Sequence, residues 1–456
     1  MKRAVPLCVI LLLAGCAGPK AQLPSDARVT PPTGWRGGAA GSSAVTADWW
    51  RSFNDPVLSV IVDTALAHNT DIAIAATRVA AARAEYRLAR AQGRPNVGAT
   101  LAGGRDEDVN PGFGFQETQT TGQAEIAIAY DADLFGGLAA TTASAKASLL
   151  ATEAARDNVR LAVMVAAAHG YITLRGLDAQ LLVLRDTLQA RADELRVAKR
   201  RAEAGYAAQL DLAQAEAAYH ATEQQIPAMQ LAIARQEDGL SLLLGSNPRD
   251  IDRDGDLDQL VAPPVPLSLP ASLLRQRPDI AEAERQLAAS DHALDAARAA
   301  FMPDIQLSAT GGFVGSSLVE GNPLGVWSLG GSILAPLFTA GRLEAAQDAA
   351  VARRDLAAFT YRKAALTAFN EVEDALQAVR RDEEQELALT AQRDSLARAL
   401  KLAANRYREG YSPYLDQLDA QRGLLTAQLA LVRARVDRLN ALVTLYQCLG
   451  GGWRSD

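Results

Sequence analysis

The sequence is poor in the residue patterns that carry chemistry. Its four histidines, His68, His169, His220 and His292, are too scattered to give a metal-ligand spacing. It contains neither a phosphate-binding glycine loop nor a Gly-x-Ser-x-Gly nucleophile turn. Acidic side chains outnumber basic ones by 53 to 46, so a nucleic-acid partner has no electrostatic support. These absences predict a protein that is not an enzyme and holds no cofactor or metal.

Cysteine is also nearly absent, and two of the three cysteines lie at the N-terminus. The start, "MKRAVPLCVILLLAGCAG", has a basic end, a short apolar run and small residues before Cys16. This is typical of a secretory signal and is too short to span a membrane. "LAGC" resembles a bacterial lipobox, which predicts removal of residues 1–15, with Cys8, and a lipid on Cys16. An ordinary signal peptide with a chance cysteine is the alternative.

The rest of the N-terminal region bears on location and on disulfides. Ala17 follows the predicted lipid-modified cysteine, where lipoproteins of the inner membrane usually carry Asp. We therefore expect an outer-membrane address and a lipidated tail over residues 16–54. Cys448 is the only other cysteine left after processing, so an intramolecular disulfide is excluded. We expect Cys448 to be a buried, small apolar side chain.

Aromatic residues make up only 5% of the chain, whereas long stretches are rich in Ala, Leu, Gln, Glu and Arg, which favours helix. These stretches belong to two copies of one unit, over 55–247 and 271–450, with a Pro- and Asp-rich linker at 248–270 and a tail at 451–456. Equivalent residues are 208 positions apart before the predicted strands and 205 after them. The pairs are Asp71 with Asp279, Pro95 with Pro303, Gly205 with Gly410, Asp211 with Asp416, and Gly245 with Gly450.

Each copy begins with a predicted helix, over 55–93 and over 271–301, that stops before a proline. The periodicity then changes to alternation, which predicts one β-hairpin in each copy, at 95–130 and at 303–334. Two very long helices follow. In the first copy they cover 138–203 and then the return to about 244.

The strands alternate between apolar and polar residues, as in transmembrane β-strands. In "QAEIAIAY", Ile126 and Ile128 share one side while Gln123 and Glu125 lie opposite. One predicted face carries Val97, Ala99, Leu101, Ala124, Ile126, Ile128, Tyr130, Ile305, Leu307, Ala309, Gly311, Phe313, Trp327, Leu329 and Ile333.

The long helices carry apolar residues in alternating steps of three and four, which indicates coiled-coil packing. A plain four-helix bundle is compatible with the same pattern, but it does not need helices of this length. The two seams are Leu174, Leu177, Leu181, Leu184, Leu188 and Leu195 in the first copy, and Leu425, Leu429, Val432, Val436, Leu439, Val443 and Tyr446 in the second.

Four short strands cannot close a barrel, since small barrels need about eight, and open edges are not tolerated in hydrocarbon. Three chains would supply about twelve strands, enough to enclose a water-filled lumen. The predicted fold is therefore mainly α, with a long α-helical coiled-coil barrel and a small β part that becomes a 12-stranded membrane barrel in a homotrimer. A small periplasmic sheet on a helical stalk is the alternative.

Several stretches resemble the TolC family of outer-membrane efflux factors, and most closely its OprM/NodT-like lipoprotein branch. They are "TADWWRSFNDPVLSVIVDTALAHNTDI", "YDADLFGG", "RPDIAEAERQL", "PLFTAGR" and "GYSPYLDQLDAQR". The resemblance covers the mature chain. It implies a homotrimeric, passive exit duct in the outer membrane, joined by a periplasmic adaptor to an inner-membrane efflux pump. Two alternatives remain: the channel of a type I protein secretion system, and a lipid-anchored coiled-coil scaffold without a pore.

The resemblance also implies roles for residues around the two helical turns. The turns themselves, at Gly205, Tyr206, Gly410 and Tyr411, would contact the adaptor. Asp416 and Asp419 match the acidic rings that close the periplasmic entrance. Asp211 and Tyr407 match a pair that links neighbouring coils, whereas Ser412 stands where the family has a linking arginine. The simpler interpretation of these aspartates is stabilisation of helix N-termini.

One acidic stretch resembles a calcium-binding loop. "DIDRDGDLD", from Asp250, has Asp252, Asp254 and Gly255 at the expected positions of such a loop. Its twelfth position is Val261, where a bidentate Glu is required. We therefore interpret the stretch as a solvated linker.

Overall fold

The computed structural model describes residues 22–36, 45–109, 116–205, 209–253, 255–266, 270–318, 320–321 and 323–454. The chain divides into two compact units. Unit 1 comprises 78–153 and 282–363 with the N-terminal residues to 28, and unit 2 comprises 29–77, 154–281 and 364–456.

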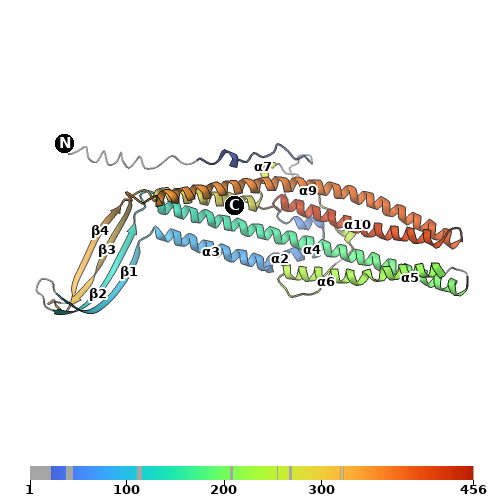
Figure 1. Ribbon diagram of the computed structural model, residues 1–456, viewed down its shortest axis with the longest axis horizontal. Coiled ribbons are helices and arrows are strands. Elements are labelled where there is room, and N and C mark those ends of the chain that lie inside the picture. The colour runs from blue at the N-terminus through green and yellow to red at the C-terminus, as the bar shows by residue number, and fades with distance from the viewer. Residues whose placement is uncertain are drawn as a thin grey trace. The chain divides into compact units, whose positions relative to one another are not determined.

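Unit 1 contains a four-stranded antiparallel sheet in the order β1-β2-β3-β4 (Figure 1). Its strands are β1 (Asn96–Val109), β2 (Gln116–Asp131), β3 (Asp304–Ser316) and β4 (Leu324–Leu334). The two hairpins predicted from alternation meet along β2 and β3, where Ile126 pairs with Gly311. Nothing in the described chain pairs with the outer edge of β1 or of β4.

Two helices of 67 residues each begin just after the hairpins, α4 (Gly137–Glu203) and α9 (Arg342–Arg408). Asp133 starts α4, because its carboxylate accepts hydrogen bonds from the amides of Leu138, at 3.1 Å, and Ala139, at 2.7 Å. These acceptors satisfy amides that have no partner inside the helix. The predicted start and end of this helix are therefore correct to within one residue.

The single helix predicted over 55–93 is wrong, because the chain forms α2 (Pro56–His68) and α3 (Thr70–Gln92). Asn69 separates them with an extended backbone. Its side-chain oxygen accepts from the amides of Asp71 and Ile72, and so restarts the helix. Pro56–Gln92 is also the one helical stretch of the described residues that is long and apolar enough to cross a membrane, and this break interrupts it.

The uninterrupted return to residue 244 is also wrong. The chain forms α5 (Gln209–Glu223) and α6 (Gln225–Leu243), which are separated at Gln224. Pro227 explains the break, since it has no amide hydrogen and its ring would clash with the carbonyl of residue 223. The equivalent helix of the second copy, α10 (Tyr414–Cys448), has no internal proline and runs for 35 residues unbroken.

The helix predicted over 271–301 is shorter in the structure and has a separate first turn. It forms α7 (Pro270–Leu273) and α8 (Pro278–Ala299). Pro278 occupies the first position of α8, where a missing amide hydrogen costs nothing. The described residues also form three short 3₁₀ helices: η1 (Ser25–Ala27), η2 (Trp49–Phe53) and η3 (Leu257–Gln259).

Two contacts of unit 2 lie at positions that the predicted repeat makes equivalent. The side-chain amide of Asn69 donates to the carbonyl of Leu243 at 3.0 Å. Arg277 donates to the carbonyl of Cys448 at 3.1 Å. The donors are 208 positions apart and the acceptors 205, the offsets found in the sequence. One contact is thus made twice, by different side chains at equivalent positions.

A group of buried side chains, here named the anchor cluster, holds the segment before α2 in unit 2. Its members are Trp49, Phe53, Asp55, Tyr171, Arg175 and Tyr446. Trp49 is fully buried and its ring stacks on that of Tyr446, with centroids 5.2 Å apart. Asp55 accepts from the Tyr171 hydroxyl at 3.0 Å and from Arg175 at 3.1 Å. A buried carboxylate is thereby paired and hydrogen-bonded, as burial of charge requires.

The predicted coiled-coil seams face the interior. Every seam residue of α4 and α10 is at least partly buried, and Leu174 and Val443 are fully buried. Burial of side chains of this size contributes about 1.5–3 kcal/mol each.

Candidate functional site

The sheet has one apolar and one polar face, as its alternation predicts. Val97 pairs with Ile128, and Ile128 with Ala309, so these side chains share a face. Large apolar residues on this face are exposed, with Leu101 at 87% and Trp327 at 82%. Most paired residues on the opposite face are small or polar, such as Thr310 with Ser328, although Val314 pairs with Leu324 there. Such a sheet suits a boundary between lipid and water.

The two long helical hairpins turn at glycines, and both turns lie at the same end of unit 2 (Figure 1). Gly205 has φ 78° and Gly410 has φ 79°. This left-handed conformation favours glycine because a Cβ atom would be crowded. Tyr411, next to the second turn, is 78% exposed.

A small apolar cluster lies near the turns and joins α4, α5 and α10. This tip cluster consists of Ala198, Ala215, Ala218, Tyr414 and Leu418, with Leu195, Leu212 and Tyr407 packed against it. Burial first, and then the Glu194 carboxylate, raise the pKa of Tyr414 to about 12. The tip cluster is built largely from alanines, so it buries little area per residue.

The four predicted gate residues surround this cluster without forming a bonded group within one chain. Asp211 lies half-buried in the first turn of α5, and Asp416 and Asp419 are exposed in the first turns of α10. The ring centres of Tyr407 and Tyr414 lie 5.3 Å apart. The Arg201 guanidinium lies 5.4 Å from the centre of the Tyr407 ring.

A buried polar contact beside the tip cluster was not predicted from the sequence. The Glu194 carboxylate of α4 accepts from the Gln417 side chain of α10 at 2.7 Å and also from that of Gln421. Gln417 and Gln421 are 6% and 8% exposed. Arg191, one turn earlier on α4, donates to the carbonyl of Ala218 on α5. Helix α4 therefore holds both its own hairpin partner and the second hairpin.

Comparison with known proteins identifies the chain. The family model described as outer membrane efflux protein matches residues 61–246 and 269–451. The chain belongs to the outer membrane efflux protein family. It is accordingly an outer-membrane exit duct and not an enzyme, and the resemblance seen in the sequence is confirmed.

Similar proteins match this efflux protein over nearly its full length. The toluene efflux pump outer membrane protein TtgC of Pseudomonas putida is 35% identical over 92% of the chain and 89% of its own length. The pyoverdine export outer membrane protein OpmQ of Pseudomonas aeruginosa is 34% identical over 100% of the chain and 98% of its own length. The solved structure of the outer-membrane channel OprN is 29% identical, with a TM-score of 0.89, over 96% of the chain and 99% of that channel.

Two predicted site residues of the efflux protein have no described position, and the Ser412 hydroxyl has no bonded partner among the described residues. Cys16 and Tyr206 lie outside the described residues. Ser412, which stands in place of the expected linking arginine, is half-buried. Its hydroxyl oxygen is buried without a hydrogen-bond partner in the described chain. The link that an arginine would make to a neighbouring coil therefore has no replacement from Ser412 within the chain.

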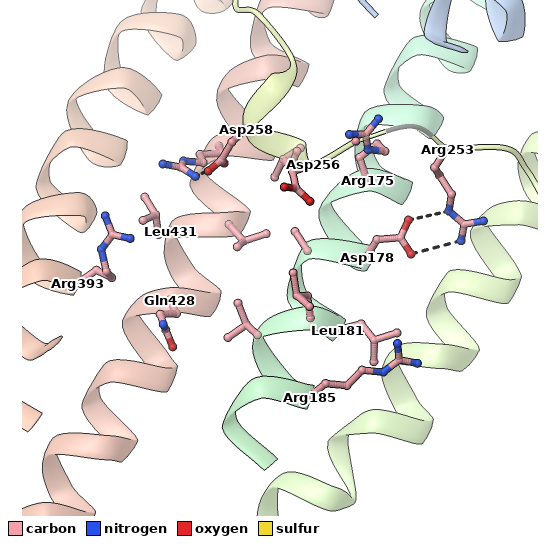
Figure 2. A pocket seen from close by; sticks show the side chains of 17 residues that line it. Arg175, Asp178, Leu181, Arg185, Arg253, Asp256, Asp258, Arg393, Gln428 and Leu431 are labelled. Atoms are coloured by element: carbon pink, nitrogen blue, oxygen red, sulfur yellow. Dashed lines mark hydrogen bonds and ion pairs between the residues drawn. The ribbon is translucent and has the colours of Figure 1, made fainter. Parts of the chain in front are cut away.

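In the efflux protein, charged residues of the stretch that resembles a calcium-binding loop form ion pairs with the helices. Arg253 donates to the Asp178 carboxylate at 2.7 Å and 3.3 Å, and Figure 2 shows both contacts. It also pairs with Glu237 on α6 at 2.5 Å, and Asp258 pairs with Arg435 of α10. The linker thus ties helices of both copies together, and within the described residues it forms no group of metal ligands.

Proposed function

We propose that three copies of the chain assemble into one passive duct, in which the β1 edge of each copy joins the β4 edge of the next. The observation that carries this proposal is the sheet, whose two outer edges are open while its apolar face is exposed. Closure by neighbouring copies would satisfy the edge amides and carbonyls, which hydrocarbon requires. The twelve strands would then surround a lumen that is lined by their polar face.

The helical turns would dock the partners that supply energy. The exposed ring of Tyr411, with Tyr206, Gly205 and Gly410, would contact a periplasmic adaptor that connects the duct to an inner-membrane pump. A passive duct needs such a pump, because a channel by itself supplies no energy for transport.

Asp416 and Asp419 would close the periplasmic entrance. Both carboxylates are exposed on one face of the first turns of α10, so three copies would bring six of them together. Clustered carboxylates repel one another unless cations compensate. Asp211 and Tyr407 would link neighbouring coils in this closed state.

The cargo would be small toxic compounds. Similar proteins are named for toluene efflux and for pyoverdine export. A duct that encloses its cargo in water selects weakly by chemistry, so we propose that the pump sets the specificity.

Deletion of the gene, followed by exposure to a panel of antibiotics and solvents, tests this function. We expect sensitivity to several compounds and rescue by the intact gene. Loss of secretion of one protein without any drug sensitivity would instead indicate a type I secretion channel. Purified protein that neither forms trimers nor conducts ions in a planar bilayer would indicate a scaffold and overturn the proposal.

Lipid attachment at Cys16 has its own test. Cys16→Ser should abolish labelling by radioactive palmitate, because no other N-terminal cysteine survives processing. Retained labelling would refute lipidation at this residue. We expect the variant to rescue drug resistance at least partly, since the barrel itself would insert in the membrane.

A further inference from the structure

The polar face of the sheet carries charge of one sign only. Its described carboxylates are Asp106 near the loops, Asp131 and Asp304 near the helices, and Glu125 between them. Arg105 is the only basic residue of the four strands, and its register places it on the apolar side. None of the carboxylates on the polar face therefore has a basic partner on the same face.

The cross-strand neighbours of Glu125 have short side chains. It pairs with Thr100 of β1 and with Gly312 of β3. A Cβ atom at Gly312 would lie 2.1 Å from the carbonyl oxygen of Ala124, so a larger residue cannot flank Glu125 there. The flanking positions on β2 are Gln123 and Ala127. Glu125 is thus the one ionisable side chain in the middle of this face.

Within the described chain, one polar side chain is bonded to Glu125. The Gln123 amide donates to Glu125 at 2.7 Å. The charge is therefore oriented and hydrogen-bonded without being neutralised.

The geometry points to Glu125 as a charge-selectivity residue of the duct, contributing one carboxylate per copy to a ring inside the β-barrel. This inference rests on the proposed function, because the ring exists only if the polar face lines a trimeric lumen. The ring would favour cationic over anionic solutes in the membrane part of the duct, apart from any selection at Asp416 and Asp419. Rings of acidic side chains select cations in this way in other pores.

Ionic strength gives the inference a sharp signature. The Debye length is about 30 Å in 0.01 M salt and about 3 Å in 1 M salt. In dilute salt the electric field of the ring would extend across the lumen. In concentrated salt it would be screened close to the carboxylates. The contribution of Glu125 to selectivity should therefore grow as salt is diluted.

Reversal potentials of trimers in planar bilayers, under a KCl gradient, test the inference. Glu125→Gln keeps the shape and removes the charge, so the ratio of potassium to chloride permeability should fall about twofold in dilute salt. The matched control is Glu107→Gln, which removes a carboxylate from the apolar side of β1. We expect the control to leave the ratio unchanged.

The measurements are repeated with Asp416→Ala and Asp419→Ala present, so that a narrow entrance does not hide the barrel. Glu125→Cys adds an independent readout, because Cys448 is buried and protected from reagents. A sulfonate-bearing thiol reagent should restore the potassium preference of that variant, and an ammonium-bearing reagent should reduce it further.

The outcomes separate the two claims. Conducting channels whose permeability ratio is the same before and after Glu125→Gln, in both backgrounds, would overturn the inference and leave the duct intact. Absence of trimers and of conductance in the unaltered protein would overturn the proposed function, and the inference with it.

Discussion

The anchor cluster and the tip cluster both pack α4 against α10, but they differ in the size of the buried side chains. In the anchor cluster, Trp49 and Tyr171 are fully buried around a carboxylate paired with arginine. In the tip cluster, three of the five buried side chains are alanines, and the neighbouring aspartates are exposed.

This difference predicts that the two ends of one coiled coil differ in local stability. Large aromatic side chains bury more area than alanines and contribute correspondingly more to stability. Contacts such as those of Glu194 with Gln417 are directional and lost together when the helices separate. Regions with little buried apolar area open at lower free energy than the core. We therefore expect the tip cluster to open at a lower free energy than the anchor cluster.

Breaking the anchor cluster should have the largest effect on stability. Arg175→Met leaves Asp55 buried without its cation, which costs about 3–5 kcal/mol. We expect a strong fall in the melting temperature of the helical signal in circular dichroism. Arg185→Met, on an exposed position of the same helix, is the control and should change stability by less than about 0.5 kcal/mol. Equal effects of the two changes would refute the anchoring role.

Alkaline pH offers a second comparison, since burial raises the pKa of both Tyr171 and Tyr414 to about 12. Above pH 10 the unfolded chain ionises these tyrosines while the folded chain keeps them neutral. Stability is therefore full below pH 10 and is lost up to pH 12, by at most about 3 kcal/mol for each tyrosine. In Tyr414→Phe we expect a smaller loss over this range, measured by chemical unfolding at pH 9 and pH 11. An unchanged loss would show that Tyr414 does not contribute.

Loosening the tip should have a smaller and more local effect. Glu194→Ala removes the acceptor shared by the buried amides of Gln417 and Gln421, and loss of such a partner costs about 1–3 kcal/mol. We expect faster hydrogen exchange in the first turns of α10 and little change around Tyr171. Uniformly faster exchange through both clusters would mean that the tip is not an independent unit.

The smallest effect on stability is expected at the predicted gate. Asp416 and Asp419 are exposed, and the pair of Asp419 with Arg422, at 3.7 Å, is worth little in water. Replacing both aspartates with Ala should nevertheless raise single-channel conductance or weaken block by multivalent cations. If conductance and block both stay unchanged, the gate assignment is removed.

Local pattern sufficed for several features of the fold. Alternation along "QAEIAIAY" assigned Ile126 and Glu125 to opposite faces, because successive strand residues always point to opposite sides. The glycines at 205 and 410 predicted the two turns, because glycine tolerates the positive φ that these turns require. The helix break at Gln224, which Pro227 causes, was not predicted although its cause is equally local. The apolar spacing continues across the break and so concealed it.

Other features depended on which helix lies against which. Glu194 is separated by more than 200 residues from Gln417, and nothing in an Ala- and Gln-rich helix marks one glutamine as buried. Likewise, Asn69 and Arg277 make equivalent contacts with different chemistry, so only the positions repeat. The sequence by itself determined the strands, their faces and the two glycine turns, because these follow from short-range sterics and periodicity. The tertiary structure alone decided the polar partners, because a hydrogen bond between distant helices depends on their packing register.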